Sequence, residues 1–405
     1  MEDVVTETDD KKITRREFLK KAAVGAVGLG VGLYAIDKLL FKKTLSQISQ
    51  NLTSGLGVAP SGDAPADLWK WSKEAYNYIK LGENVKCQNC PHGCLLQKNE
   101  RSICRNKVNK DGKLYTLAYG NPCSVYVDPV EKKPLFHFLP GSTAFSIATA
   151  GCNFRCKNCQ NWEISQSRPE DTQNYDMMPE RVVEGAKSNN CASIAYTYSE
   201  PNAYYEYMYD TSKIARASGV KNLWITNGYL NEKPVRDLCE YIDAANVDLK
   251  SFKESIYNDL NAGTLQPVLD TLKTLKDENV WFEVTNLVVP TYTDDLDMIS
   301  EMCGWLVKNI STDYPLHFSR FHSVYKLANL PPTPVDFLEK VRKIALDAGL
   351  KFVYIGNVPG HEAQNTYCPK DGKVAISRDG YSVKFVNFEN GYCKSCGEKI
   401  PGVWR

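Results

Sequence analysis

The segment AGCNFRCKNCQNW, residues 150–162, is called the cysteine loop below, because it places three cysteines within eight residues. Cys152, Cys156 and Cys159 follow the spacing C-x3-C-x2-C, and the next cysteine in the chain is Cys191. Closely spaced cysteines hold metal more often than they form disulfides. Three thiolates without a fourth leave one coordination position of a metal centre open. A catalytic metal centre binds its substrate at such an open position.

Around this loop, apolar strand-like segments alternate with amphipathic helical segments. Such an order is typical of βαβ units and predicts a parallel sheet in an α/β fold. Six or seven units fit a complete or partial TIM-type barrel. The expected strands are 144–149, 192–197, 222–226, 246–249, 281–289, 316–321 and 352–356, and the expected helices are 178–189, 203–218, 232–244, 265–278, 294–309 and 334–349.

Polar residues follow most of these strands. In a TIM-type barrel, catalytic groups gather at the carboxyl ends of the strands. The cysteine loop follows the first expected strand, and the candidates after later strands are Glu200, Asn227, Asp248, Lys250 and His322. The sequence therefore predicts one site built from several loops.

A second set of cysteines precedes the expected barrel. Cys87, Cys90, Cys94 and Cys104, called the N-terminal cysteine group below, supply four thiolates, which suffice for a closed metal site. Zinc and an auxiliary 4Fe–4S cluster both fit this spacing. Cys239 and Cys303 fall instead on apolar stripes of expected helices, and they are interpreted as small buried hydrophobes.

The cysteine loop after a first strand resembles the radical S-adenosylmethionine (SAM) superfamily. The resemblance implies a 4Fe–4S cluster on Cys152, Cys156 and Cys159, with SAM bound at the iron that lacks a cysteine. It also implies reductive cleavage of SAM to a 5′-deoxyadenosyl radical. For the loop alone, the alternatives are a zinc knuckle and an ordinary cluster with a remote ligand.

Further motifs narrow the resemblance to the AmmeMemoRadiSam-system radical SAM enzymes, which are similar to pyruvate formate-lyase activating enzymes. The similarity covers about residues 82–402. The motifs are DPVEKKPLFHFLPGS (128–142), AGCNFRCKNCQNWEISQ (150–166), YTYSEPN (196–202), TNGY (226–229), DLK (248–250), FHSVYKL (321–327), VYIGNVPG (353–360) and NTYCP (365–369).

This resemblance assigns roles to the polar residues after the strands. Glu200 is expected to accept hydrogen bonds from the SAM amino group, and Asn227 to reach the ribose hydroxyls. Asp248 and Lys250 share a strand face, from which they contact the SAM carboxylate or the substrate. His322 is expected to contact SAM. Each residue also has an interpretation without SAM. Glu200 is then a surface acid and Asn227 a turn residue, Asp248 and Lys250 form an ion pair, and His322 is a structural histidine.

The last cysteines resemble the two knuckles of a zinc ribbon. Cys368 begins one knuckle, and Cys393 and Cys396 form the other. The family pattern has a second cysteine where this chain has Asp371, and a carboxylate oxygen can complete a zinc site. A Cys3Asp site is expected, and a degenerate, metal-free knuckle is the alternative.

The first residues resemble a twin-arginine export signal, since Arg15 and Arg16 precede an apolar, glycine-rich run. A membrane-associated or exported protein is therefore expected, tethered through this segment, with the side of the membrane open. The expected divisions are a signal or anchor (1–43), a linker (44–84), an N-terminal cysteine-rich metal-binding segment (85–140), the barrel (141–362) and a zinc-ribbon-like segment (363–405).

The predicted function is radical SAM chemistry on an unknown substrate. A low-potential electron donor is required, and a protein substrate and the partner proteins of the AmmeMemoRadiSam system are expected. The alternatives are a glycyl-radical-enzyme activase and an exported iron–sulfur electron-transfer protein. With 49 basic and 48 acidic residues, the chain has no net field that would steer it to nucleic acid, so no nucleic-acid partner is expected.

Overall fold

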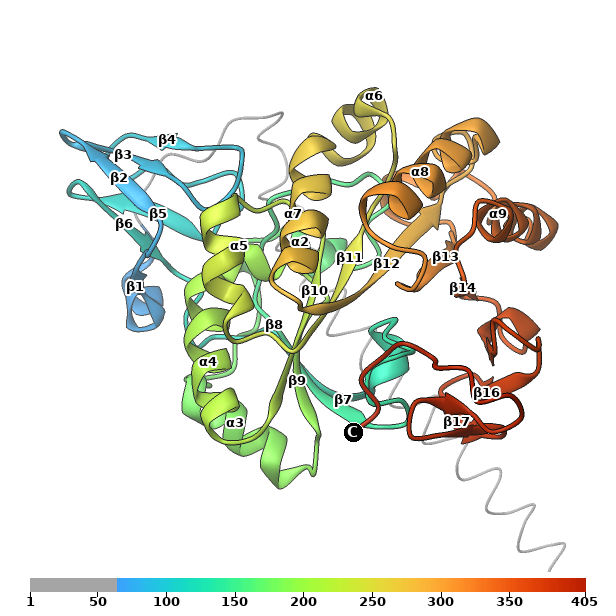
Figure 1. The fold of residues 1–405 in the computed structure, drawn as a ribbon. Coiled ribbons are helices and arrows are strands. Elements are labelled where there is room, and N and C mark those ends of the chain that lie inside the picture. Colours follow the sequence, from blue (N-terminus) through green and yellow to red (C-terminus); the bar gives the residue numbers. More distant parts are fainter. Residues whose placement is uncertain (1–63) are drawn as a thin grey trace, which may run out of the picture. The chain divides into compact units, whose positions relative to one another are not determined.

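An eight-stranded sheet forms the centre of the computed structural model, which describes residues 64–405 (Figure 1). The strand order is β14-β13-β12-β11-β10-β9-β8-β7; β7 pairs antiparallel with β8, and all other pairs are parallel. The strands are β7 (Ser124–Pro129), β8 (Thr143–Ala148), β9 (Ser193–Tyr196), β10 (Lys221–Thr226), β11 (Ala244–Asp248), β12 (Trp281–Val288), β13 (Leu316–Arg320) and β14 (Val353–Gly356). This confirms the predicted α/β class with a mostly parallel sheet.

Helices connect the parallel strands and cover the outer face of the sheet (Figure 1). Their apolar stripes explain the packing: Val182, Val183 and Ala186 of α3, for example, share one buried face. The apolar core between sheet and helices includes Trp224 of β10 and Phe282 of β12. The helices are α3 (Pro179–Ser188), α4 (Tyr205–Ala217), α5 (Glu232–Cys239), α7 (Gln266–Asp277), α8 (Leu296–Asn309) and α9 (Val335–Asp347).

The sheet does not close into a complete barrel through strand pairing, because β7 and β14 are its two edges. The segment after β7 turns inward instead, where Val130, Leu135 and Phe138 pack against Ala144 and neighbouring strand residues. Of the two predicted forms, complete or partial, the complete barrel is not shown. The strands form an open sheet, and side chains of the segment after β7 pack against one side of it.

Small antiparallel units precede and follow this sheet. The first contains η1 (Ala66–Trp71) and the sheets β1-β6-β5 and β2-β3-β4, and the last contains the sheets β15-β16-β17 and β18-β19. Residues 66–83, placed in a linker by the sequence, therefore carry η1, β1 and β2. The strands are β1 (Lys73–Glu74), β2 (Tyr78–Leu81), β3 (Asn84–Cys87), β4 (Leu95–Leu96), β5 (Lys107–Lys110), β6 (Lys113–Thr116), β15 (Thr366–Tyr367), β16 (Val374–Asp379), β17 (Ser382–Phe385), β18 (Phe388–Glu389) and β19 (Tyr392–Cys393).

The predicted localisation, membrane-associated or exported, is contradicted. Within residues 64–405, the helices are all too short or too polar to cross a bilayer. The segment that resembles an export signal or anchor, residues 1–43, lies outside the described residues.

Candidate functional site

The cysteine loop leaves the sheet at the carboxyl end of β8 and leads into the short helix α2 (Trp162–Ser165). Two backbone hydrogen bonds tie it to the π-helix η5 (Tyr257–Asn261). The amide of Arg155 donates to the carbonyl of Asn261 at 2.9 Å, and the amide of Lys157 donates to that of Leu260 at 2.9 Å. The middle of the loop is therefore held by backbone contacts on both sides of Cys156.

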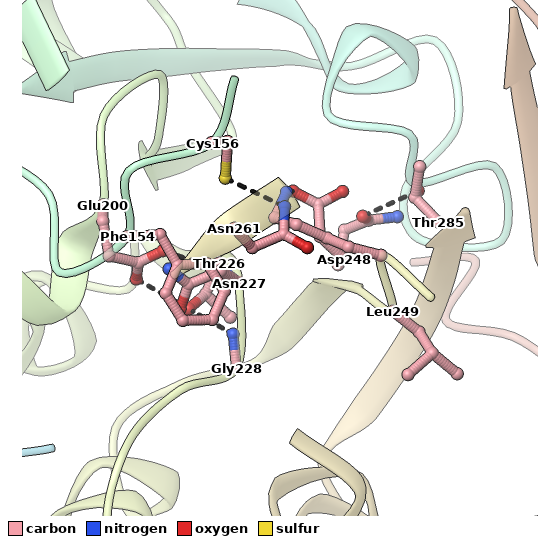
Figure 2. A network of polar contacts seen from close by, with 12 residues as sticks. Phe154, Cys156, Glu200, Thr226, Asn227, Gly228, Asp248, Leu249, Asn261 and Thr285 are labelled. Atoms are coloured by element: carbon pink, nitrogen blue, oxygen red, sulfur yellow. Dashed lines mark hydrogen bonds and ion pairs between the residues drawn. The ribbon is translucent and has the colours of Figure 1, made fainter. Parts of the chain in front are cut away.

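Two of the three thiols in this loop accept hydrogen bonds from N–H groups. The amide of Phe154 donates to Cys152 Sγ at 3.3 Å. Asn261 Nδ2 donates to Cys156 Sγ at 3.2 Å (Figure 2). Burial raises the pKa of Cys156 to about 11, and the ammonium of Lys250 partly offsets this rise. The free thiol is thus protonated at neutral pH, and binding of a metal group there releases the proton.

Glu200 is buried after β9, at the start of the 3-10 helix η4 (Pro201–Tyr204). Its Oε1 accepts from the amide of Asn202 at 3.1 Å and from Thr226 Oγ1 at 2.7 Å. Its Oε2 accepts from the amide of Asn227 at 2.8 Å. Burial raises the pKa of Glu200 to about 7, although these hydrogen bonds favour the ionised form. Figure 2 shows this carboxylate beside the cysteine loop.

The side chain of Asn227 joins the turn after β10 to the cysteine loop. Its Nδ2 donates to Asn153 Oδ1 at 2.7 Å, and its Oδ1 accepts from the amide of Tyr229 at 2.9 Å. Asn153 Nδ2 in turn donates to the carbonyl of Tyr229 at 2.9 Å. The expected ribose-binding amide is thus already engaged with protein groups.

Asp248 and Lys250 form an ion pair, with Lys250 Nζ 2.9 Å from Asp248 Oδ2. Asp248 ends β11, and the amide of Lys250 donates to Tyr257 Oη at 3.1 Å. His322 lies just beyond β13, where it is exposed and outside this hydrogen-bond network. The structure therefore brings Glu200, Asn227, Asp248 and Lys250 to the cysteine loop, with His322 at the periphery.

Sequence reasoning missed Asn153, Thr226 and Asn261, which orient the loop and the Glu200 carboxylate. Asn153 directly follows Cys152 and Thr226 directly precedes Asn227, so adjacency to a predicted site residue was the available signal. Asn261 carries no such signal, because it comes from a π-helix about a hundred residues further along the chain.

The comparisons with known proteins agree with this site. A family model described as the radical SAM superfamily matches residues 146–303. An uncharacterised protein of Methanocaldococcus jannaschii is 48% identical over 334 residues, which are 82% of this chain and 99% of that protein. The chain belongs to the radical SAM superfamily. Within the superfamily, the pyruvate formate-lyase 1-activating enzyme of Escherichia coli K12 is 25% identical over 222 residues, 50% of this chain and 89% of that enzyme.

Among solved structures, a domain of pyruvate formate-lyase-activating enzyme from Bacteroides vulgatus matches 41% of this chain and 99% of its own, with a TM-score of 0.37 and 14% identity. The superfamily implies a 4Fe–4S cluster and SAM. The residues present fit that cluster: three thiols share one loop, one of them buried and two partly buried, and N–H groups face two of the sulfurs. Asn261 Oδ1, buried without a hydrogen-bond partner, adds a free acceptor beside Cys156.

At the other end of the chain, Cys368, Asp371, Cys393 and Cys396 could hold a metal ion, because their ligand atoms all lie within 4.8 Å of one another. Cys368 Sγ lies 3.5 Å from Cys396 Sγ, and Cys393 Sγ lies 3.6 Å from Asp371 Oδ2. In a tetrahedral zinc site with Zn–S bonds of about 2.3 Å, sulfurs lie about 3.8 Å apart. This C-terminal group therefore has the spacing of a single-ion site.

Replacing Asp371 with alanine is expected to weaken zinc binding at the C-terminal group by about 10- to 100-fold, because three thiolates remain without the carboxylate. Zinc affinity measured by competition with a chromogenic chelator checks this. Asp379→Ala, which removes an exposed carboxylate at the end of β16, is the matched control. Equal zinc affinity in the two variants would show that Asp371 is not a ligand.

Proposed function

We propose that this chain is a radical SAM enzyme built on a partial barrel, with a 4Fe–4S cluster held by Cys152, Cys156 and Cys159. The observation that carries the proposal is the position of the Glu200 carboxylate next to these three thiols. Burial raises the pKa of the Cys152 thiol, and the carboxylate lies close enough to raise that pKa further by charge repulsion. When bound, the reduced cluster supplies the electron that cleaves SAM to methionine and a 5′-deoxyadenosyl radical, which abstracts a hydrogen atom from the substrate.

The residues around the loop are proposed to hold SAM. Glu200 accepts from the SAM ammonium, and its three protein donors leave one carboxylate position for this bond. Lys250 faces the SAM carboxylate while Asp248 balances its charge. Asn227 positions the cysteine loop through its hydrogen bond to Asn153, and its side-chain amide also hydrogen-bonds to the ribose of SAM. His322 contacts SAM from the rim.

The subfamily and substrate belong to the same proposal. The motifs quoted above support an AmmeMemoRadiSam-system enzyme that acts on a protein or peptide, receives electrons from a low-potential donor and works with the partner proteins of that system. The second candidate is a glycyl-radical-enzyme activase, which the match to the E. coli activating enzyme favours. An iron–sulfur electron carrier does not need a buried carboxylate such as Glu200 beside an open cluster. The position of Glu200 therefore argues against the electron-transfer alternative.

The deciding experiment is reductive SAM cleavage by the full chain. Anaerobically reconstituted protein is incubated with SAM and a strong reductant, and 5′-deoxyadenosine is quantified by mass spectrometry, with a sample lacking reductant as the blank. Deoxyadenosine above the blank supports the proposal. Protein with a verified cluster that neither binds SAM nor forms this product would favour the electron carrier.

Replacing Glu200 with glutamine is expected to weaken SAM binding by about 10- to 100-fold, because a charge-assisted hydrogen bond to the ammonium contributes about 1.5–3 kcal/mol. Because the pKa of Glu200 is raised to about 7, its ionised form increases as the pH rises through 7. SAM affinity of the wild type should therefore increase over that range. Equilibrium dialysis of reconstituted protein with labelled SAM at several pH values measures both effects.

The matched control for this substitution is Glu163→Gln, which neutralises an exposed carboxylate on α2, next to the cysteine loop. It should retain both the affinity and the pH dependence. If Glu200→Gln binds SAM as tightly as Glu163→Gln does, the ammonium is held elsewhere, and Glu200 only orders the backbone after β9 and β10.

A further inference from the structure

The four thiols of the N-terminal cysteine group line one small cavity behind the cysteine loop. Cys87 ends β3, Cys90 and Cys94 lie between β3 and β4, and Cys104 precedes β5. The cavity wall also includes Asn153 of the cysteine loop. Thiols from two separate stretches of chain therefore converge on one enclosed space.

The ligand types of this group differ from those of the C-terminal group. The four cysteines that line the cavity supply four thiolates, which is the ligand set of a 4Fe–4S cluster. In the C-terminal group, Asp371 supplies a carboxylate oxygen as one of the four ligand atoms.

A buried ion pair lies beside the same cavity. Lys107 is 1% exposed, lines the cavity, and places its Nζ 2.5 Å from Glu206 Oε1. Because Glu206 pairs with this ammonium, Lys107 adds a charged N–H donor to the cavity wall without a net positive charge, and hydrogen bonds to cluster sulfurs help to set a reduction potential.

Direct contacts join the wall of this cavity to the cysteine loop. His92 Nε2 lies 2.8 Å from the carbonyl oxygen of Asn153. The carbonyl oxygen of Cys104 packs so closely on Gly151 that an added Cβ would lie 2.4 Å from it. The two segments that carry these cysteines are therefore in direct contact.

We propose that the N-terminal cysteine group holds an auxiliary 4Fe–4S cluster, ligated by four thiolates and placed to deliver electrons to the cluster of the cysteine loop. The assignment of a cluster to the N-terminal cysteine group rests on the cavity itself. Only the assignment of the cysteine-loop cluster as electron acceptor rests on the proposed function. A low-potential one-electron donor of the ferredoxin or flavodoxin class reduces the auxiliary cluster by one electron. The same electron then passes on, and no atom or proton is transferred.

The test begins with a variant that lacks the other cluster, Cys152→Ala/Cys156→Ala/Cys159→Ala. It should retain about four irons and about four acid-labile sulfides per chain, together with a reduced-state electron paramagnetic resonance signal that SAM does not alter. Adding Cys90→Ala and Cys94→Ala should remove them. Sulfide is the deciding readout, because single-ion sites contain none. A triple variant without labile sulfide overturns the proposal, whatever its zinc content, because the C-terminal group can also bind zinc.

Electron delivery is tested in protein that retains the cysteine loop. Cys90→Ala/Cys94→Ala should slow reduction of the remaining cluster by reduced ferredoxin at least tenfold, while the small reductant dithionite reduces it normally. Cys123→Ala, which removes a thiol outside the cavity, is the matched control and should change neither rate. Equal ferredoxin rates in the two variants would remove the delivery role and leave a structural cluster. Because none of these readouts requires SAM cleavage, they remain informative if the proposed function fails.

Discussion

Replacing Cys156 with alanine is expected to abolish 5′-deoxyadenosine formation and to remove about four irons per chain. Cys156 lies between the two backbone bonds that hold the loop on η5, so the backbone there should stay in place without the sulfur. Two thiolates then remain for a cluster that requires at least three. Iron and sulfide analysis together with the SAM-cleavage assay measures the result.

The matched control is Cys303→Ala, the same atomic change at a fully buried thiol on α8. It leaves a small hole in the apolar core and should cost about 1–2 kcal/mol of unfolding free energy. Its iron content and activity should match the wild type. If Cys156→Ala also keeps its full iron content and activity, the cluster does not use the cysteine loop.

The sequence was informative about the fold because hydrophobic periodicity reflects burial. All seven expected strands correspond to β8–β14, since strands covered on both faces read as continuous apolar runs. β7 was missed: it is an edge strand with exposed residues such as Tyr126, and its pattern does not stand out from the preceding loops. Edge pairing is decided by tertiary contacts, which also determine that the sheet stays open.

The candidate site was predictable where chemistry is concentrated in short motifs, as around Cys152 and Glu200. Its hydrogen-bond geometry was not predictable, because the donors come from distant elements such as η5. The contact between Cys104 and Gly151 shows the same limit. Nothing in the residue types indicates that the two cysteine groups lie back to back, since that arrangement follows from how β3–β5 pack on the loop after β8.

Replacing Gly151 with alanine is expected to destabilise both cysteine groups together. Gly151 has a φ of +96°, and an added Cβ would lie 2.4 Å from the carbonyl oxygen of Cys104 and 2.5 Å from Asn106 Oδ1. The first contact is with backbone, so the chain itself must move. Left-handed strain and overpacking together should cost about 2–5 kcal/mol of unfolding free energy. Anaerobic denaturant unfolding and iron analysis of reconstituted protein measure the loss.

The control separates strain from steric contact. Gly219, with a φ of +75° after α4, has no atom within 4 Å of an added Cβ, so Gly219→Ala should cost only about 1–2 kcal/mol through its backbone and leave the iron content unchanged. Gly151→Ala should lose iron from the cysteine loop and the N-terminal cysteine group alike, because the clash pushes the two apart. Equal losses of stability in the two variants, with full iron in both, would mean that the contact between Cys104 and Gly151 is not tight, and would weaken the argument that electrons cross there.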